Sequence, residues 1–187
     1  MFKNNKINKI LLIIPPANIF DGNLDINPIP PIGLGYLAAS LKDLNKEIKI
    51  IDSLAEGWNN RVQIDNNIEH IGLSFEDIGK MIFDFKPDLV GVSNHFTRQR
   101  KNAHKIYSIV KKIKSDIITV AGGAHPTADP EEEIKNEFLD YIVLGEADHS
   151  FRDLILFLED KITIYKLNGI VYKKNEIVKT IQKTKFI

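Results

Sequence analysis

The chain has 187 residues, 43% of them hydrophobic, and its 25 basic and 25 acidic side chains give a formal net charge of zero. This size favours one domain with a sizeable core, and the balanced charge gives no reason to expect a nucleic acid as partner. The chain contains no cysteine, which excludes disulfides, thiolate-bound zinc and iron–sulfur clusters held by its own side chains.

No apolar run in the sequence is long enough to cross a membrane, so no membrane partner is expected. Residues 1–9 are basic, and the apolar run that follows is ended by Pro15 and Pro16. This run is too short for a signal peptide, and we therefore expect a cytoplasmic protein. The sequence does not indicate an oligomeric state.

Five short apolar runs predict strands that are buried on both faces, as in a parallel sheet. They are residues 9–14, 47–51, 88–93, 117–120 and 141–144. Helical spacing or capping patterns between and after them predict helices. These helices are residues 31–45, 74–85 and 98–115, one that starts at Asp129 and Pro130, and one capped by Ser150 with Asp153.

Strands that alternate with helices predict an α/β protein with a doubly wound, flavodoxin-like sheet of five parallel strands in the order 2-1-3-4-5. Residues 17–30, which contain Asn, Asp, Gly and Pro, are predicted to be a long loop, and residues 53–72 are predicted to be a second one. Residues 167–172 and 176–180 read as a C-terminal β-hairpin whose turn includes Asn175. We expect residues 1–160 to form the α/β domain and residues 161–187 to form a hairpin extension.

The fourth predicted strand runs directly into a glycine pair, Gly122 and Gly123. Two residues without side chains allow a sharp turn and the close approach of a flat ligand. Asp129 and Pro130 suit the N-cap and the first position of the helix that follows. In open parallel sheets ligands bind at this edge, outside the carboxyl ends of the strands.

The loops that follow the first, third, fourth and fifth strands should meet at this one edge, and we take their small and polar residues as the candidate cofactor site. These residues are Pro16, Ala17, Asn18, Ser93, Asn94, His95, Gly122, Gly123, Ala124, His125, Gly145 and Glu146.

Three interpretations of this edge remain open. It is a shallow platform for a large flat cofactor, bonded by backbone N–H groups and Ser93. It is a metal site formed by His95, His125, His149 and Glu146. Or it is unoccupied, and the histidines have turn or capping roles. The sequence has no phosphate loop and no nucleophile elbow, so no catalytic residue is predicted. Prolines and a serine stand where a response regulator needs acidic residues.

Six short motifs follow one another along the chain and together resemble the N-terminal cobalamin-binding domain of B12-dependent radical SAM enzymes. They are PPIGLGYLAA at 30–39, Asp52, PDLVGVS at 87–93, GGAHPT at 122–127, VLGE at 143–146 and NGIVY at 168–172. The resemblance spans roughly residues 9–181.

The resemblance implies a flavodoxin-like domain that holds cobalamin face-on over the carboxyl ends of the strands. Ser93 would lie near the buried nucleotide tail, Gly122 and Gly123 along the tail slot, and Gly145 with Glu146 on the far side. In such enzymes a C-terminal radical SAM domain of the same polypeptide uses S-adenosylmethionine and a [4Fe–4S] cluster, most commonly for methyl transfer. This chain has no cysteine for that cluster, so we expect it to be a fragment of a longer enzyme.

Two departures from the family pattern are evident. Methionine-synthase-type domains carry a cobalt-binding histidine after the first strand, whereas this chain reads PANIFDG at 16–22. Cobalamin is therefore expected in the base-off form without a histidine ligand from this loop, with His95 or His125 as the possible substitutes. Ala147 and Asp148 also replace the family's usual glycine and glutamate. The rival hypothesis is a degenerate domain that binds no cobalamin and serves as an interaction module.

Overall fold

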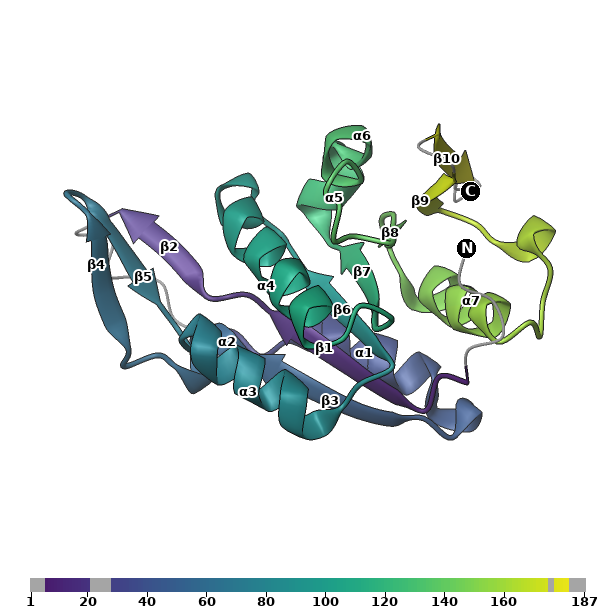
Figure 1. Ribbon diagram of the computed structural model, residues 1–187, viewed down its shortest axis with the longest axis horizontal. Helices are drawn as coiled ribbons and strands as arrows, with labels where there is room; N and C mark the ends of the chain where they lie inside the picture. Colours follow the sequence, from purple (N-terminus) through teal and green to yellow (C-terminus); the bar gives the residue numbers. More distant parts are fainter. Residues whose placement is uncertain (1–5, 21–27, 175–176, 182–187) are drawn as a thin grey trace.

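The computed structural model describes residues 6–20, 28–174 and 177–181. These residues form a seven-stranded sheet, in the order β10-β9-β8-β7-β6-β1-β3, and a smaller sheet in the order β2-β5-β4 (Figure 1). We call the second one the small sheet. Because the main sheet is mainly parallel and is flanked by helices, the predicted α/β fold class is confirmed.

The five parallel strands coincide with the five predicted ones, with ends that differ by at most two residues. They are β1 (Lys9–Ile14), β3 (Glu47–Asp52), β6 (Leu89–Ser93), β7 (Ile118–Gly122) and β8 (Tyr141–Val143). Across the sheet they lie in the order β3-β1-β6-β7-β8. Numbered by their place in the chain, they read second, first, third, fourth and fifth.

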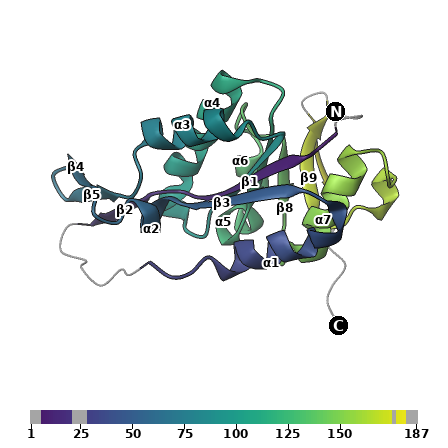
Figure 2. The ribbon, with the colours of Figure 1, turned by 90° about the horizontal axis from the view of Figure 1, so that it is seen from below.

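Helices cover both faces of the main sheet (Figure 2). Alternate side chains of β1 point to opposite faces, as in any strand. Leu12 therefore joins the core beneath one pair of helices, whereas Leu11 and Ile13 join the core beneath the other pair. The first pair is α1 (Ile32–Ser40) and α7 (Asp148–Leu158), and the second is α3 (Phe75–Phe85) and α4 (Arg100–Ile113).

The C-terminal hairpin extends the main sheet. It consists of β9 (Ile170–Lys174) and β10 (Ile177–Ile181), and β9 pairs antiparallel with β8. The sheet therefore has seven strands instead of the predicted five. The added strand β9, whose Val171 and Tyr172 side chains are buried, covers the edge that β8 would otherwise leave open. The predicted turn residue Asn175 lies outside the described residues.

The prediction of two long loops was wrong in part, because they contain the strands of the small sheet. These strands are β2 (Ala17–Phe20) in the first loop and β4 (Arg61–Asp65) and β5 (Ile68–Ile71) in the second, where a short helix α2 (Ser53–Glu56) precedes β4. All five residues of β4 are exposed. Val62 and Ile64 do alternate with polar residues in β4, but the run is short and both side chains are exposed, so the strand does not stand out from the surrounding loop sequence. Residues 21–27 of the first loop lie outside the described residues.

Two of the predicted helix starts need correction. A short helix, α5 (Ala124–Ala128), begins directly after Gly123, and α6 (Pro130–Glu133) follows it. Pro130 does begin a helix, but the Asp129 side chain makes no capping hydrogen bond. The predicted Ser150 cap is wrong, because α7 begins at Asp148 and Ser150 is buried within it.

The remaining helical elements agree with the prediction or are single turns. Ser74 caps α3 as predicted, since its side chain accepts a hydrogen bond from the Asp77 N–H at 3.0 Å. Three 3₁₀ turns complete the fold: η1 (Lys42–Leu44), η2 (Thr97–Gln99) and η3 (Ile164–Lys166). None of the described helices combines the length and the apolar composition that crossing a membrane requires.

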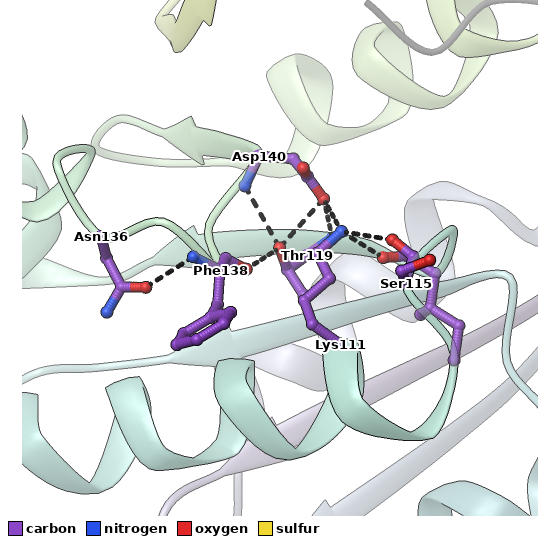
Figure 3. A network of polar contacts seen from close by, with 7 residues as sticks. Lys111, Ser115, Thr119, Asn136, Phe138 and Asp140 are labelled. Atoms are coloured by element: carbon purple, nitrogen blue, oxygen red, sulfur yellow. Dashed lines mark hydrogen bonds and ion pairs between the residues drawn. The ribbon is translucent and has the colours of Figure 1, made fainter.

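A polar network fixes the amino end of β7, at the opposite end of this strand from the glycine pair (Figure 3). The Thr119 hydroxyl donates to the Phe138 carbonyl at 2.6 Å and lies 3.0 Å from Asp140 Oδ2. Lys111 Nζ lies 2.6 Å from the same carboxylate oxygen and donates to the Ile117 carbonyl at 2.7 Å. These bonds anchor the connection that leads into β8.

Replacing Thr119 by valine is expected to lower the free energy of unfolding by about 1–2 kcal/mol, because it removes a buried hydroxyl and leaves its acceptors without that donor. Urea unfolding measures the change. Thr163→Val is the matched control, since Thr163 is exposed and makes no capping hydrogen bond. Equal stability of the two variants would contradict the role given to this network.

Candidate functional site

The edge where β1, β6 and β7 end, called here the carboxyl edge, carries two adjoining pockets. The larger pocket has a volume of ≈ 570 Å³ and lies between the ends of β1 and β3, the start of α1 and the loop after β6. The narrow pocket, of ≈ 50 Å³, lies between the main sheet and helices α1 and α7. Ser93, the last residue of β6, lines both pockets. The two are therefore parts of one site.

The narrow pocket is apolar and borders on residues that lack side chains. Leu12, Leu34 and Phe151 line it together with Gly91 and Gly122. A Cβ added at Gly122 would find its nearest neighbour, the Val143 carbonyl oxygen, at 4.0 Å. The space beside Gly122 is therefore open, and a larger side chain there would enter the pocket rather than collide with the backbone.

The second glycine has a different role, which the backbone requires. Gly123 has a φ of 103°, a conformation that favours glycine, and a Cβ there would lie 2.6 Å from the Asn94 carbonyl oxygen. The Asn94 N–H donates to the Gly122 carbonyl at 2.8 Å, and the His125 N–H donates to the Asn94 carbonyl at 3.2 Å. The loop after β6 and the turn after β7 are thus joined through their backbones.

The side chain of Asn94 is buried without a hydrogen-bond partner. The residue is 1% exposed and lines the larger pocket, and neither its Nδ2 nor its Oδ1 has a partner among the described residues. A buried amide normally makes hydrogen bonds, and each exception calls for an explanation. The unsatisfied amide of Asn94 therefore lies next to the larger pocket.

The structure separates two of the predicted histidines. His95 is exposed and lines the larger pocket, and its Nδ1 lies 3.3 Å from the Ser93 hydroxyl. His125 is 5% exposed and lines neither pocket. Its Nδ1 lies 3.2 Å from Thr97 Oγ1 and its Nε2 lies 3.5 Å from Glu133 Oε2. His125 therefore lies behind the turn, within the protein.

The other predicted site residues lie at or near this edge. Ala17 lines the larger pocket and the buried Pro16 precedes it. Ala124 is exposed at the start of α5. Gly145 has a φ of 60° and donates its N–H to Thr127 Oγ1 at 2.9 Å. Ala124, Gly145 and the exposed Glu146 do not line either pocket.

Sequence reasoning missed a network of amides that holds the small sheet against the larger pocket. The Gln99 side chain accepts from the Asn18 N–H at 2.9 Å and donates to the Asn18 carbonyl at 3.2 Å, as a neighbouring strand would. Asn102 Nδ2 donates to the Pro16 carbonyl at 2.7 Å. Neither Gln99 nor Asn102 belongs to a motif that could have indicated this role.

His70 of β5 completes the network, with its Nδ1 2.9 Å from Asn18 Oδ1. Burial lowers the pKa of His70 below its ordinary value. A neutral imidazole that donates from Nδ1 to the amide oxygen fits both observations, and this proton is assigned from the hydrogen bond.

The metal interpretation of this edge is not supported. Among residues 6–20, 28–174 and 177–181, no group of three or more histidine, aspartate and glutamate side chains is arranged to hold a metal ion. His149 is exposed on α7, and His125 lies inside the protein beside Glu133.

Comparison with known proteins yields relatives that are much longer than this chain. It is 31% identical over 176 residues to cytidylyl-2-hydroxyethylphosphonate methyltransferase of Streptomyces wedmorensis, covering 93% of this chain and 33% of that protein. It is 32% identical over 171 residues to an uncharacterised methyltransferase of Pyrococcus horikoshii, covering 91% and 34%. An anaerobic magnesium-protoporphyrin IX monomethyl ester cyclase of Rubrivivax gelatinosus is 28% identical over 172 residues, covering 88% and 27%. The chain thus spans about a third of the length of these relatives or less.

Solved structures share the fold. The cobalamin-dependent S-adenosylmethionine radical enzyme OxsB, with aqua-cobalamin and S-adenosylmethionine bound, matches 97% of this chain and 23% of its own, with a TM-score of 0.71 at 22% identity. The radical S-adenosylmethionine methyltransferase TsrM of Kitasatospora setae, with cobalamin and a [4Fe–4S] cluster bound, matches 97% of this chain and 30% of its own, with a TM-score of 0.72 at 17% identity.

The family is shown by a model of the B12 binding domain, which matches residues 27–155. The match covers well over half of the chain and includes Ser93, Asn94, Gly122 and Gly123. The resemblance seen in the sequence is therefore confirmed, and the protein belongs to the B12-binding domain family.

Proposed function

We propose that this chain holds cobalamin at the carboxyl edge, with the corrin ring over the larger pocket and the nucleotide tail directed into the narrow pocket. The observation that carries the proposal is the pair of adjoining pockets that share Ser93. A broad cavity beside a thin apolar slot suits a ligand with a wide part and a narrow part. The narrow pocket is smaller than a nucleotide base, so binding would widen it through an outward shift of α1 or α7.

Two features of the site fit cobalamin chemically. The corrin ring carries amide side chains around its periphery, and the buried Asn94 amide has both a donor and an acceptor without a partner among the described residues. The open space at Gly122 leaves room for a flat group against the sheet. Asn94 and Ser93 would hold the polar periphery, and Gly122 would border the tail.

We further propose that cobalamin binds here in the base-off form. The loop between β1 and β2 is Pro15 and Pro16, neither of which can ligate cobalt through a side-chain nitrogen. His125 is engaged with Thr97 and Glu133. His95 remains as the histidine that lines the larger pocket. Its Nδ1 faces the Ser93 hydroxyl, which supports a hydrogen-bonding role rather than a ligand role.

The relatives support a function within a larger enzyme. Bound cobalamin supplies cobalt chemistry for methyl transfer or radical reactions, and the chain's own residues bind and orient it. We propose that residues 1–160 form the cofactor domain and that residues 161–187 lead to a radical SAM domain of the same polypeptide. That domain would hold S-adenosylmethionine and the [4Fe–4S] cluster. The names of two relatives favour methyl transfer, and the cyclase favours a ring-forming reaction as the alternative.

Gly122→Val is expected to raise the Kd for hydroxocobalamin at least about tenfold, because the new side chain enters the narrow pocket. A tenfold increase in Kd corresponds to a loss of about 1.4 kcal/mol of binding free energy. The fold should tolerate the change, since a Cβ at this position has no neighbour closer than 4.0 Å and valine suits a strand. Titration followed by absorption spectroscopy measures the Kd, and urea unfolding checks the fold.

Gly35→Ala is the matched control, because Gly35 lies on α1 outside both pockets and a Cβ there meets no atom within 4 Å. Gly123 is unsuitable for this test, since its substitution would disturb the turn itself. Wild-type affinity in Gly122→Val would contradict the placement of the nucleotide tail in the narrow pocket.

After reduction, bound cobalamin is expected to show the absorption and electron paramagnetic resonance spectra of the base-off form, and His95→Ala is expected to leave them unchanged. His149→Ala, at an exposed position on α7, serves as the control. A nitrogen-ligated spectrum that disappears only in His95→Ala would show that His95 binds cobalt and would contradict the proposed absence of a histidine ligand.

A further inference from the structure

A carboxylate lies inside the protein next to the candidate site without lining either pocket. Glu133, the last residue of α6, is 0% exposed, whereas Glu131 and Glu132 of the same helix are exposed. A buried charge is costly unless it is paired. The surroundings of Glu133 therefore indicate what this charge does.

Two histidines from different elements meet at one oxygen of Glu133. His104 Nε2, from α4, lies 2.9 Å from Glu133 Oε2, and His125 Nε2, from α5, lies 3.5 Å from the same atom. The second distance is too long for a good hydrogen bond but short enough for electrostatic attraction. Burial, and next the charge of Glu133, raise the pKa of the neighbouring Tyr107 well above its ordinary value.

The ring of His125 connects this carboxylate to the loop after β6. A carboxylate beside Nε2 favours a proton on that nitrogen, because the attraction stabilises an N–H directed at it. In the neutral ring, Nδ1 is then an acceptor, and it lies 3.2 Å from Thr97 Oγ1. These two distances assign to His125 the tautomer in which Nε2 carries the proton toward Glu133 and Nδ1 accepts a hydrogen bond from the Thr97 hydroxyl.

Thr97 belongs to the segment that forms one wall of the larger pocket. This wall is residues 94–99, of which Asn94, His95, Phe96, Arg98 and Gln99 line the pocket. Besides the backbone hydrogen bonds of Asn94 to Gly122 and His125, two side-chain contacts hold the wall. Gln99 ties it to β2 through the Asn18 backbone, and Thr97 ties it to His125. The contact between Gln99 and Asn18 is between neutral groups, whereas the contact between Thr97 and His125 involves a histidine that lies next to the buried carboxylate of Glu133.

We propose that Glu133 is a positioning residue for the cobalamin pocket: through His125 it holds Thr97, and so keeps residues 94–99 in the arrangement that binds the cofactor. This inference rests on the proposed function and assigns a role to a residue that touches neither pocket.

Affinity for hydroxocobalamin in Thr97 and Glu133 variants of the full chain tests the proposal. Thr97→Val keeps the shape but removes the hydroxyl and should weaken binding about three- to tenfold. Thr97→Ser restores the hydroxyl and should restore wild-type affinity. Glu133→Gln should weaken binding by at least the same factor. The double variant should bind no more weakly than Glu133→Gln alone, because the hydroxyl acts only through the oriented imidazole.

Two further measurements separate positioning from general stability. Thr119→Val makes the same chemical change in the network at the other end of β7 and should lower stability without changing the affinity. Nitrogen NMR of the imidazoles, with His125→Gln to assign the signal, should show the proton of His125 on Nε2 in the wild type. In Glu133→Gln the protonated nitrogen should change or the two tautomers should mix.

The outcomes distinguish this inference from the proposed function. A wild-type chain that retains no hydroxocobalamin contradicts the proposed function, and the inference fails with it. A wild type that binds while Thr97→Val and Glu133→Gln bind equally well contradicts the inference alone. Additive losses in the double variant, or a loss that Thr97→Ser does not restore, also contradict it.

Discussion

The close approach of the Asn94 backbone to Gly123 is the contact on which the carboxyl edge depends. It requires a residue without Cβ, because a methyl group there would lie 2.6 Å from the Asn94 carbonyl oxygen. The contact fixes the end of β6 against the end of β7, so that Ser93 lies between the larger and the narrow pocket. It also directs the following turn inward and places His125 beneath the surface, where it meets Glu133. The two glycines of the pair thus have separate tasks: Gly123 allows the turn, and Gly122 leaves the space that the turn borders.

The pocket is assembled from segments that are distant in sequence, and polar side chains hold them in register. The small sheet lines the larger pocket through Ala17 and Ile19, and the Gln99 amide binds the edge strand β2 as another strand would. On the other side of residues 94–99, side-chain contacts from Thr97 to His125 and from His125 to Glu133 connect this segment to the buried interior. The apolar cores determine how the helices lie on the main sheet. The amide network and the buried charge then determine the fine placement of the loops, which burial of apolar surface alone does not specify.

The part of this fold that follows from apolar patterning could be predicted from the sequence. β1, β6 and β7 are buried on both faces and read as continuous apolar runs, and a parallel sheet brings their ends to one edge. The small sheet was harder to predict, because β4 is exposed along its whole length and its alternation is limited to Val62 and Ile64 within a short polar run. The role of His125 was also beyond the sequence, since a histidine next to a glycine turn can point into a ligand site or into the protein. Glu133 is one of three consecutive glutamates at the start of a helix, and only the structure shows that it alone of the three is buried and contacts His104 of α4. Spacing therefore predicted which loops meet at this edge, whereas the direction of each polar side chain required the structure.

The central claim is that this edge of the sheet binds cobalamin, and the most direct measurement is the absorption spectrum of the wild-type chain after incubation with hydroxocobalamin and desalting. The account predicts that corrinoid bands remain with the wild-type protein in one-to-one stoichiometry. It also predicts that less corrinoid remains with Gly122→Val, in which the space at this position is filled. A desalted protein without corrinoid bands would contradict the account.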